Sequence, residues 1–78
     1  MELINIGFNS YISEDKIVSV LNPDSAPIRR LIQDAKDKSL LIDASFGRST
    51  KSIILIENGM VVLSSLTPEE IESRIRKD

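Results

Sequence analysis

Two apolar runs on either side of an Asn-Gly pair constrain this chain more than any other feature of its sequence. Ile53-Ile54-Leu55-Ile56 lies within an expected strand over Lys51–Ile56, and Met60-Val61-Val62-Leu63 begins a second over Met60–Ser65. The Asn58-Gly59 pair between them is the strongest short signal for a β-hairpin. Neither run alternates between apolar and polar residues, and continuous apolar strands are typical of burial on both faces of a sheet. The pattern therefore predicts a hairpin that needs cover on both sides.

Three further strands and two helices are expected around this hairpin. One strand starts at Leu3 and ends or bends at Gly7, a second lies within Ile12–Leu21, and a third follows at Leu40–Ala44. Capping residues and apolar periodicity predict the two helices. Residues 1–78 are thus expected to form a single α+β domain. Its architecture is a roughly five-stranded, mostly antiparallel sheet with one long helix and a short C-terminal helix.

Capping residues mark where each helix begins. Ser25 is the expected N-cap of a helix from about Ala26 to Lys38, with Pro27 in its first turn. Apolar residues at i, i+3, i+4 and i+7 give this helix one buried face, made of Ile28, Leu31, Ile32 and Ala35. Thr67 and Glu70 form a capping box at the start of the second helix.

Two helices are little cover for strands as apolar as these. They cover a single face of a five-stranded sheet, and the remaining side chains would form an apolar patch of the size that marks an interface. A chain of 78 residues also has a small core, and without Cys it has no disulfides to support it. We therefore expect a homo-oligomer. The alternative is that the second helix folds onto the other face and suffices.

Composition excludes several classes of function. The chain has no His, no Cys and no glycine-rich phosphate loop, so we expect no metal, no cofactor, no small-molecule substrate and no enzyme. Paired carboxylates such as Asp43 and Glu57 leave a small hydrolase or isomerase as a remote alternative. The first residues lack the regions of a signal peptide and no apolar run approaches the ~20 residues of a membrane span, so we expect a cytoplasmic protein without a membrane partner.

One loop stands out by its charge. The net charge of −2 argues against a monomer that coats nucleic acid, yet no acid lies between Asp43 and Glu57. Arg48 and Lys51 stand within that gap, together with Ser45, Ser49, Thr50 and Ser52. Such side chains bind phosphate oxygens. A solvated loop with ordinary surface charges is the simpler interpretation for one subunit, whereas a closed assembly would repeat the loop into a row of phosphate contacts.

Five segments, in order and over nearly the whole chain, carry a resemblance to a known family. They are Ile4–Gly7, Asn22–Ala35, Leu41–Ala44, Gly47-Arg48 and Val62–Ser65. The most specific part is Pro23-Asp24-Ser25-Ala26-Pro27-Ile28 followed by Gln33-Asp34-Ala35. The chain resembles the RemA family, the bacterial extracellular-matrix regulatory proteins and their relatives.

The resemblance implies a DNA-binding transcriptional regulator of biofilm-matrix genes. It also implies assembly into ring-like oligomers that present many copies of a basic surface to DNA. In the family pattern the loop after Asp-Ala reads Gly-Arg-Arg-Thr-Arg, and its adjacent arginines contact DNA. Here Arg48 and Thr50 match, Lys51 keeps the charge, and Ser49 replaces an arginine. A further basic position of the family falls on Lys16.

We therefore expect double-stranded DNA and further copies of this chain as partners. The expected DNA-binding residues are Arg48, Ser49, Thr50, Lys51 and Lys16, with Arg29 and Arg30 in support. The alternative from another class is a protein-binding oligomeric scaffold or adaptor that touches no nucleic acid. The acidic net charge and the surplus of apolar surface fit that alternative.

Overall fold

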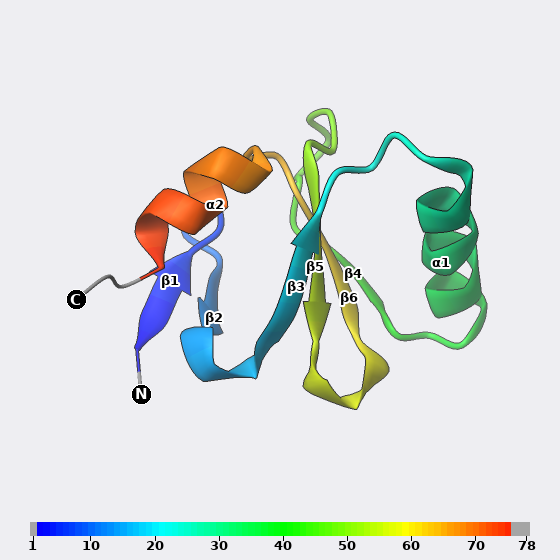
Figure 1. The fold of residues 1–78 in the computed structure, drawn as a ribbon, viewed down its shortest axis with the longest axis horizontal. Coiled ribbons are helices and arrows are strands. Elements are labelled where there is room, and N and C mark those ends of the chain that lie inside the picture. Colours follow the sequence, from blue (N-terminus) through cyan, green and yellow to red (C-terminus); the bar gives the residue numbers. More distant parts are fainter. Residues whose placement is uncertain (1, 76–78) are drawn as a thin grey trace.

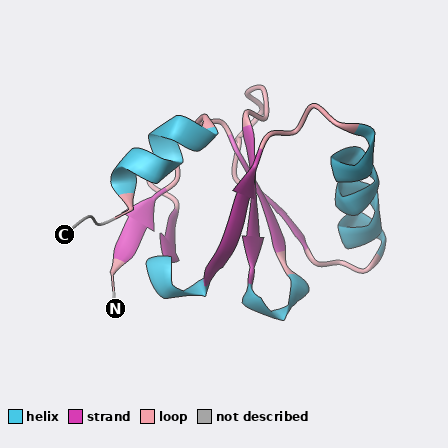
Figure 2. Cartoon of the chain, viewed as in Figure 1, coloured by secondary structure: helices cyan, strands magenta, loops and turns pink. Residues whose placement is uncertain are grey.

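The computed structural model describes residues 2–75, which form three layers. A four-stranded sheet lies in the middle, helix α1 (Ala26–Asp37) covers one face, and a two-stranded hairpin with helix α2 (Pro68–Arg74) covers the other (Figures 1 and 2). The predicted α+β class, with one long helix and a short second one, is confirmed. No helix among residues 2–75 has the length and apolar character needed to cross a membrane.

The central sheet has the strand order β3-β5-β6-β4. Its strands are β3 (Ile17–Leu21), β4 (Leu41–Asp43), β5 (Ser52–Ile56) and β6 (Val61–Ser64). The β3–β5 and β5–β6 pairs are antiparallel, and β4 runs parallel to β6. Asn58 and Gly59 join β5 to β6 with φ values of 77° and 82°, the two successive positive angles that make Asn-Gly a hairpin signal.

The strand expected within Ile12–Leu21 is two strands in two different sheets. Strand β2 (Tyr11–Ser13) pairs with β1 (Leu3–Asn5), and a 3₁₀ turn over Glu14–Lys16 separates it from β3. The turn is polar, and Glu, Asp and Lys are depleted in strands, which explains why the chain breaks there. The structure thus has a sheet of two strands and a sheet of four, in place of the single five-stranded sheet that was predicted.

Strands β5 and β6 are buried on both faces, as their sequences predicted. Ile54 and Val62 point to the hairpin and α2, where they pack with Ile4, Ile6, Ala44 and Ile71. Ile53 and Val61 point to α1 and pack with Ala35. The expectation that one face would stay uncovered is wrong, because the β1–β2 hairpin supplies the cover that the helices lack. Burial of the central strands therefore needs no second copy of the chain.

Helix α1 packs less deeply than its sequence suggested. The Ser25 hydroxyl accepts a hydrogen bond from the Ile28 N–H at 3.4 Å, which confirms the predicted N-cap. Of the four apolar residues predicted on its inner face, only Ala35 is fully buried, and Ile28, Leu31 and Ile32 stay partly exposed. The apolar surface that remains free thus lies on α1 and at exposed side chains of strands and loops, not on the central strands.

Helix α2 is held by the predicted capping box. The Glu70 N–H donates to the Thr67 hydroxyl at 3.1 Å, and the Thr67 N–H donates to Glu70 Oε1 at 2.8 Å. Ile71, one turn into the helix, is completely buried against the inner face of the hairpin. The cap therefore fixes the helix at the end of the sheet where four connecting loops meet.

Candidate nucleic-acid interface

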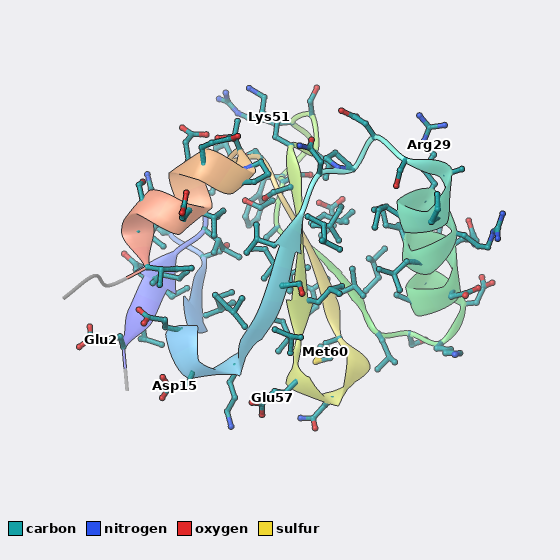
Figure 3. All side chains as sticks on the ribbon, in the orientation of Figure 1. Glu2, Asp15, Arg29, Lys51, Glu57 and Met60 are labelled. Atoms are coloured by element: carbon teal, nitrogen blue, oxygen red, sulfur yellow. The ribbon has the colours of Figure 1, made fainter. Side chains whose placement is uncertain are left out.

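An open groove of about 820 Å³ lies at one end of the central sheet. Figure 3 shows Lys51 at this end, and Glu57 and Asp15 at the opposite end. The groove is formed by the β1–β2 turn, the β4–β5 loop, the β6–α2 connection and one side of α2. It is lined by Asn5, Gly7, Phe8, Asn9, Gly47, Arg48, Ser49, Lys51, Ser65, Leu66, Glu70 and Arg74.

The β4–β5 loop owes its shape to one carboxylate. The N–H and the hydroxyl of Ser45 donate to Asp43 Oδ1 at 2.9 and 2.5 Å. These two hydrogen bonds, the hydroxyl first, lower the pKa of Asp43 below its ordinary value of 3.8. A turn then follows in which the Arg48 N–H donates to the Ser45 carbonyl at 3.1 Å. Its central residues Phe46 and Gly47 have φ values of 53° and 82°.

The β1–β2 turn repeats this construction. The Gly7 N–H donates to Asn5 Oδ1 at 2.7 Å, and the Ser10 N–H closes a turn on the Gly7 carbonyl at 2.9 Å. Its central residues Phe8 and Asn9 have φ values of 53° and 61°. Each turn therefore places a Phe at its first central position, where a bulky side chain is strained by about 1–3 kcal/mol.

The two turns bring their aromatic rings together beside an arginine. The rings of Phe8 and Phe46 meet edge to face, with centroids 5.5 Å apart and planes inclined by 61°. The Arg48 Cζ lies 5.0 Å from the Phe8 ring centroid, within the range of a cation–π contact. All three side chains are exposed to solvent. This group of Phe8, Phe46 and Arg48 is called the aromatic cluster below.

Three cations line the groove, against one carboxylate. Arg48 and Lys51 come from the β4–β5 loop, and Arg74 comes from the last turn of α2. The Lys51 N–H is fixed to the Ser64 carbonyl at 2.8 Å, and Arg74 Nη1 donates to the Asn5 carbonyl at 2.9 Å. The only salt bridge within residues 2–75 joins Lys16 to Glu57, so none of the three cations is neutralised by direct pairing.

Glu70 is the carboxylate of the groove. The N–H and hydroxyl of Thr67 lower the pKa of Glu70 below its ordinary value of 4.5, and the charges of Lys51 and Arg74 lower it further. Glu70 is therefore ionised at neutral pH. With three cations and this one anion, the lining keeps a net positive charge on a chain that is acidic as a whole.

Comparison with known proteins places the chain in a family. A model described as "RemA-like: Extracellular matrix regulatory protein A-like" matches residues 3–75. The chain belongs to the RemA-like family. The membership expected from the sequence is thereby confirmed.

Curated RemA-like relatives match nearly all of this chain. A "Putative regulatory protein" of Coprothermobacter proteolyticus is 51% identical over 75 residues, which cover 96% of this chain and 71% of that protein. One of the same description from Dictyoglomus turgidum is 48% identical, with 96% and 88% covered. Extracellular matrix regulatory protein A of Bacillus subtilis is 43% identical, with 96% and 84% covered. These names support a regulatory role for the family.

The groove of this RemA-like protein contains part of the predicted DNA-binding set. Arg48, Ser49 and Lys51 line it. Thr50 is half-buried and lines a neighbouring depression, which Lys51 shares with the β3–α1 loop. Arg29 and Arg30 lie on the first turns of α1 and do not line the groove. Figure 3 shows Arg29 at the same end of the molecule as Lys51, on the other side of the sheet.

Lys16 lies at the opposite end of the sheet from the groove. It precedes β3, whose Ile17 pairs with Ile56, whereas Lys51 precedes the other end of β5. The five residues of β5 separate the two lysines by about 17 Å of strand. Lys16 Nζ is 3.6 Å from Glu57 Oε1 in an exposed ion pair. Within one subunit Lys16 is therefore not part of the groove surface.

The same topology removes one alternative raised by the sequence. Asp43 ends β4 at the groove end of the sheet, and Glu57 follows β5 at the far end. Because these two carboxylates lie at opposite ends, they cannot act together as an acid–base pair within a subunit. The hypothesis of a hydrolase or isomerase built on this pair is wrong.

The DNA-binding residues predicted from the sequence do not include Phe8 and Arg74, which also line the groove. Arg74 was visible as a cation near the end of a helix, a position that the helix dipole explains without any ligand. Phe8 directly follows Gly7, and its position after a predicted strand end marks a turn. Neither signal shows that the two residues meet the β4–β5 loop, because that depends on how the hairpin and α2 pack.

Proposed function

We propose that this RemA-like protein is a non-enzymatic, DNA-binding transcriptional regulator that works as a homo-oligomer. Its groove would contact the phosphate backbone of double-stranded DNA. The observation that carries the proposal is the meeting of Arg48, Lys51 and Arg74 in one open groove, with no salt bridge to any of them from within residues 2–75. Cations that remain exposed and unpaired are available to phosphate oxygens.

The acidic net charge fits this proposal when the groove is repeated. One subunit offers few phosphate contacts, and the remainder of its surface repels DNA. Subunits that share one DNA add their contacts through effective concentration, so weak individual sites give useful binding. Exposed apolar side chains support self-association; they include Leu3, Tyr11, Val18, Ile42 and Phe46. The name of the Bacillus subtilis relative extends the proposal to extracellular-matrix genes.

The first prediction concerns the two loop cations. The double variant Arg48→Ala, Lys51→Ala should bind double-stranded DNA more weakly in filter binding across a salt series. Because log K falls with log salt by about 0.9 for each phosphate contact, two lost contacts should make this slope shallower by about 1.8 per bound subunit.

The matched control removes two cations outside the groove. Lys36→Ala with Lys38→Ala makes the same change in net charge at the C-terminal end of α1. This control should keep nearly the whole salt slope. Equal losses in the two double variants would assign DNA binding to overall charge and overturn the groove as its site.

A protein-binding scaffold is the second candidate, favoured by the exposed apolar side chains and the acidic net charge. It predicts an assembly that does not retain DNA even at low salt. The same filter-binding series on the unmodified protein separates the two functions.

A further inference from the structure

We infer that Phe8 is a positioning residue that holds the Arg48 guanidinium in the groove for phosphate, so that the β1–β2 turn and the β4–β5 loop together form one binding site. The inference rests on the proposed DNA-binding function. It adds a residue from a distant part of the chain that was not among the DNA-binding residues predicted from the sequence.

The first support is the geometry of the aromatic cluster. The Arg48 Cζ lies 5.0 Å from the Phe8 ring centroid. A cation–π contact attracts the charge to the face of the ring and supplies no hydrogen-bond acceptor, so it satisfies none of the five N–H donors of the guanidinium. Arg48 donates no side-chain hydrogen bond within residues 2–75, which means that the contact with Phe8 fixes the charge without using its donors.

The second support is that Phe46 holds Phe8 in turn. The two rings meet edge to face at 5.5 Å, and Phe46 belongs to the same turn as Arg48. Edge-to-face packing is a favoured arrangement of aromatic pairs. The arginine is thus held through the backbone of its own turn and through a ring from the other turn. This double attachment limits the orientations of a side chain that would otherwise rotate freely.

The third support is that Phe8 is not part of the hydrophobic core. Its side chain is 47% exposed and belongs to neither hydrophobic core cluster. Its φ of 53° is a conformation that Gly or Asn adopts more easily. An exposed aromatic residue at a strained position contributes little to folding, and its contact with Arg48 gives it a role on the surface.

The test compares Phe8→Leu, Phe8→Tyr and Phe8→Asn in DNA filter binding. Leu and Asn remove the ring, and Asn also relieves the backbone strain, so a fall in binding by Phe8→Asn cannot be ascribed to a weakened fold. An exposed cation–π contact corresponds to roughly a two- to five-fold change, so we expect that loss per subunit for Leu and Asn, and binding within about two-fold for Tyr.

Ser39→Asn is the matched control, since Ser39 has φ of 60° beyond the end of α1, far from the groove. It should leave binding unchanged.

A double-mutant cycle separates this inference from the proposed function. In an Arg48→Ala background, Phe8→Leu should cause no further loss, because the arginine that Phe8 positions is gone. A loss that persists in that background would mean that Phe8 itself contacts DNA or another copy of the chain, and it would overturn the positioning role. Light scattering on each variant would show whether another copy is involved. If Arg48→Ala weakens binding and Phe8→Leu does not, the inference fails alone. If the unmodified protein retains no DNA even at low salt, the proposed function fails with it.

Discussion

A single side-chain oxygen shapes each of the two turns at the groove end of this protein. Asp43 accepts two hydrogen bonds from Ser45 and thereby fixes the start of the turn that presents Arg48. Asn5 performs the same task for the turn that carries Phe8. Because a carboxylate accepts more strongly when it is charged, the β4–β5 loop should depend on pH while the β1–β2 turn should not.

The stability of the fold should therefore fall in acid, and Asp43 should account for part of that decline. The pKa of Asp43 is lowered in the folded state, so its contribution is present above its ordinary value of 3.8 and is lost as pH falls through the folded value. Asp43→Ala should cost about 1 kcal/mol at neutral pH and flatten the decline in melting temperature below about pH 4. Asp15→Ala, at the other end of the sheet, is the control and should keep the decline of the unmodified protein. Equal acid sensitivity in both variants would contradict this role for Asp43.

Some residues of the site could be predicted from the sequence and others could not. Arg48 and Lys51 were recognisable because a gap in the distribution of acids surrounds them. Phe8 was not, because a cation–π contact across forty residues depends on packing that no local pattern encodes. Lys16 was recognisable by its charge, but the direction of one strand places it at the end of the subunit opposite to the groove.

At the scale of elements, the β1–β2 hairpin decides how the sheet is covered. Ile4 points inward and is buried with Ile54 and Val62, whereas its neighbour Leu3 points outward and is 58% exposed. The hairpin thus acts as a third covering element alongside the two helices. Its inner face should carry much of the stability of that side of the sheet.

The two neighbours on β1 provide a matched test. Ile4→Ala should lower the free energy of unfolding by about 2–4 kcal/mol, because it opens a cavity against β5 and β6. Leu3→Ala should cost less than about 1 kcal/mol. Urea unfolding at one fixed protein concentration measures both. Similar costs for the two variants would mean that the hairpin does not seal the sheet.

The helices were predictable because their signals are local. Ser25 and Thr67 mark helix starts, and each accepts a hydrogen bond from the N–H three residues later, at Ile28 and Glu70. The sheet was less predictable because pairing is not local. Nothing in Tyr11–Ser13 shows that this strand leaves the main sheet to pair with β1, and the error of one strand changed the expected cover of a whole face.

At the scale of the whole molecule, uncovered central strands are no longer the reason to expect an oligomer. The central strands are covered within one subunit, so the case now depends on exposed apolar side chains and on the shallow packing of α1. A single core of this size typically contributes only about 3–5 kcal/mol. Association would add to that stability and would also repeat the groove.

Light scattering at micromolar concentration should therefore give a mass that is a multiple of 8.7 kDa. The urea midpoint should rise with protein concentration, because association stabilises the folded subunit by mass action. A mass of 8.7 kDa with a midpoint that is independent of concentration would contradict self-association. It would also remove the multivalent explanation for DNA binding by an acidic chain.

The paired turns have a consequence for how this surface can change. In each turn the hydrogen bonds that set the backbone lie behind the tip, at Asn5 and Gly7 in one and at Asp43 and Ser45 in the other. The tips, at positions 8 and 9 and at 46 to 49, contribute no side chain to the core. The side chains at these positions can be substituted without changing the fold, provided that each new residue tolerates the positive φ of a left-handed position. A library varied only at these positions would sample new binding surfaces on a constant frame.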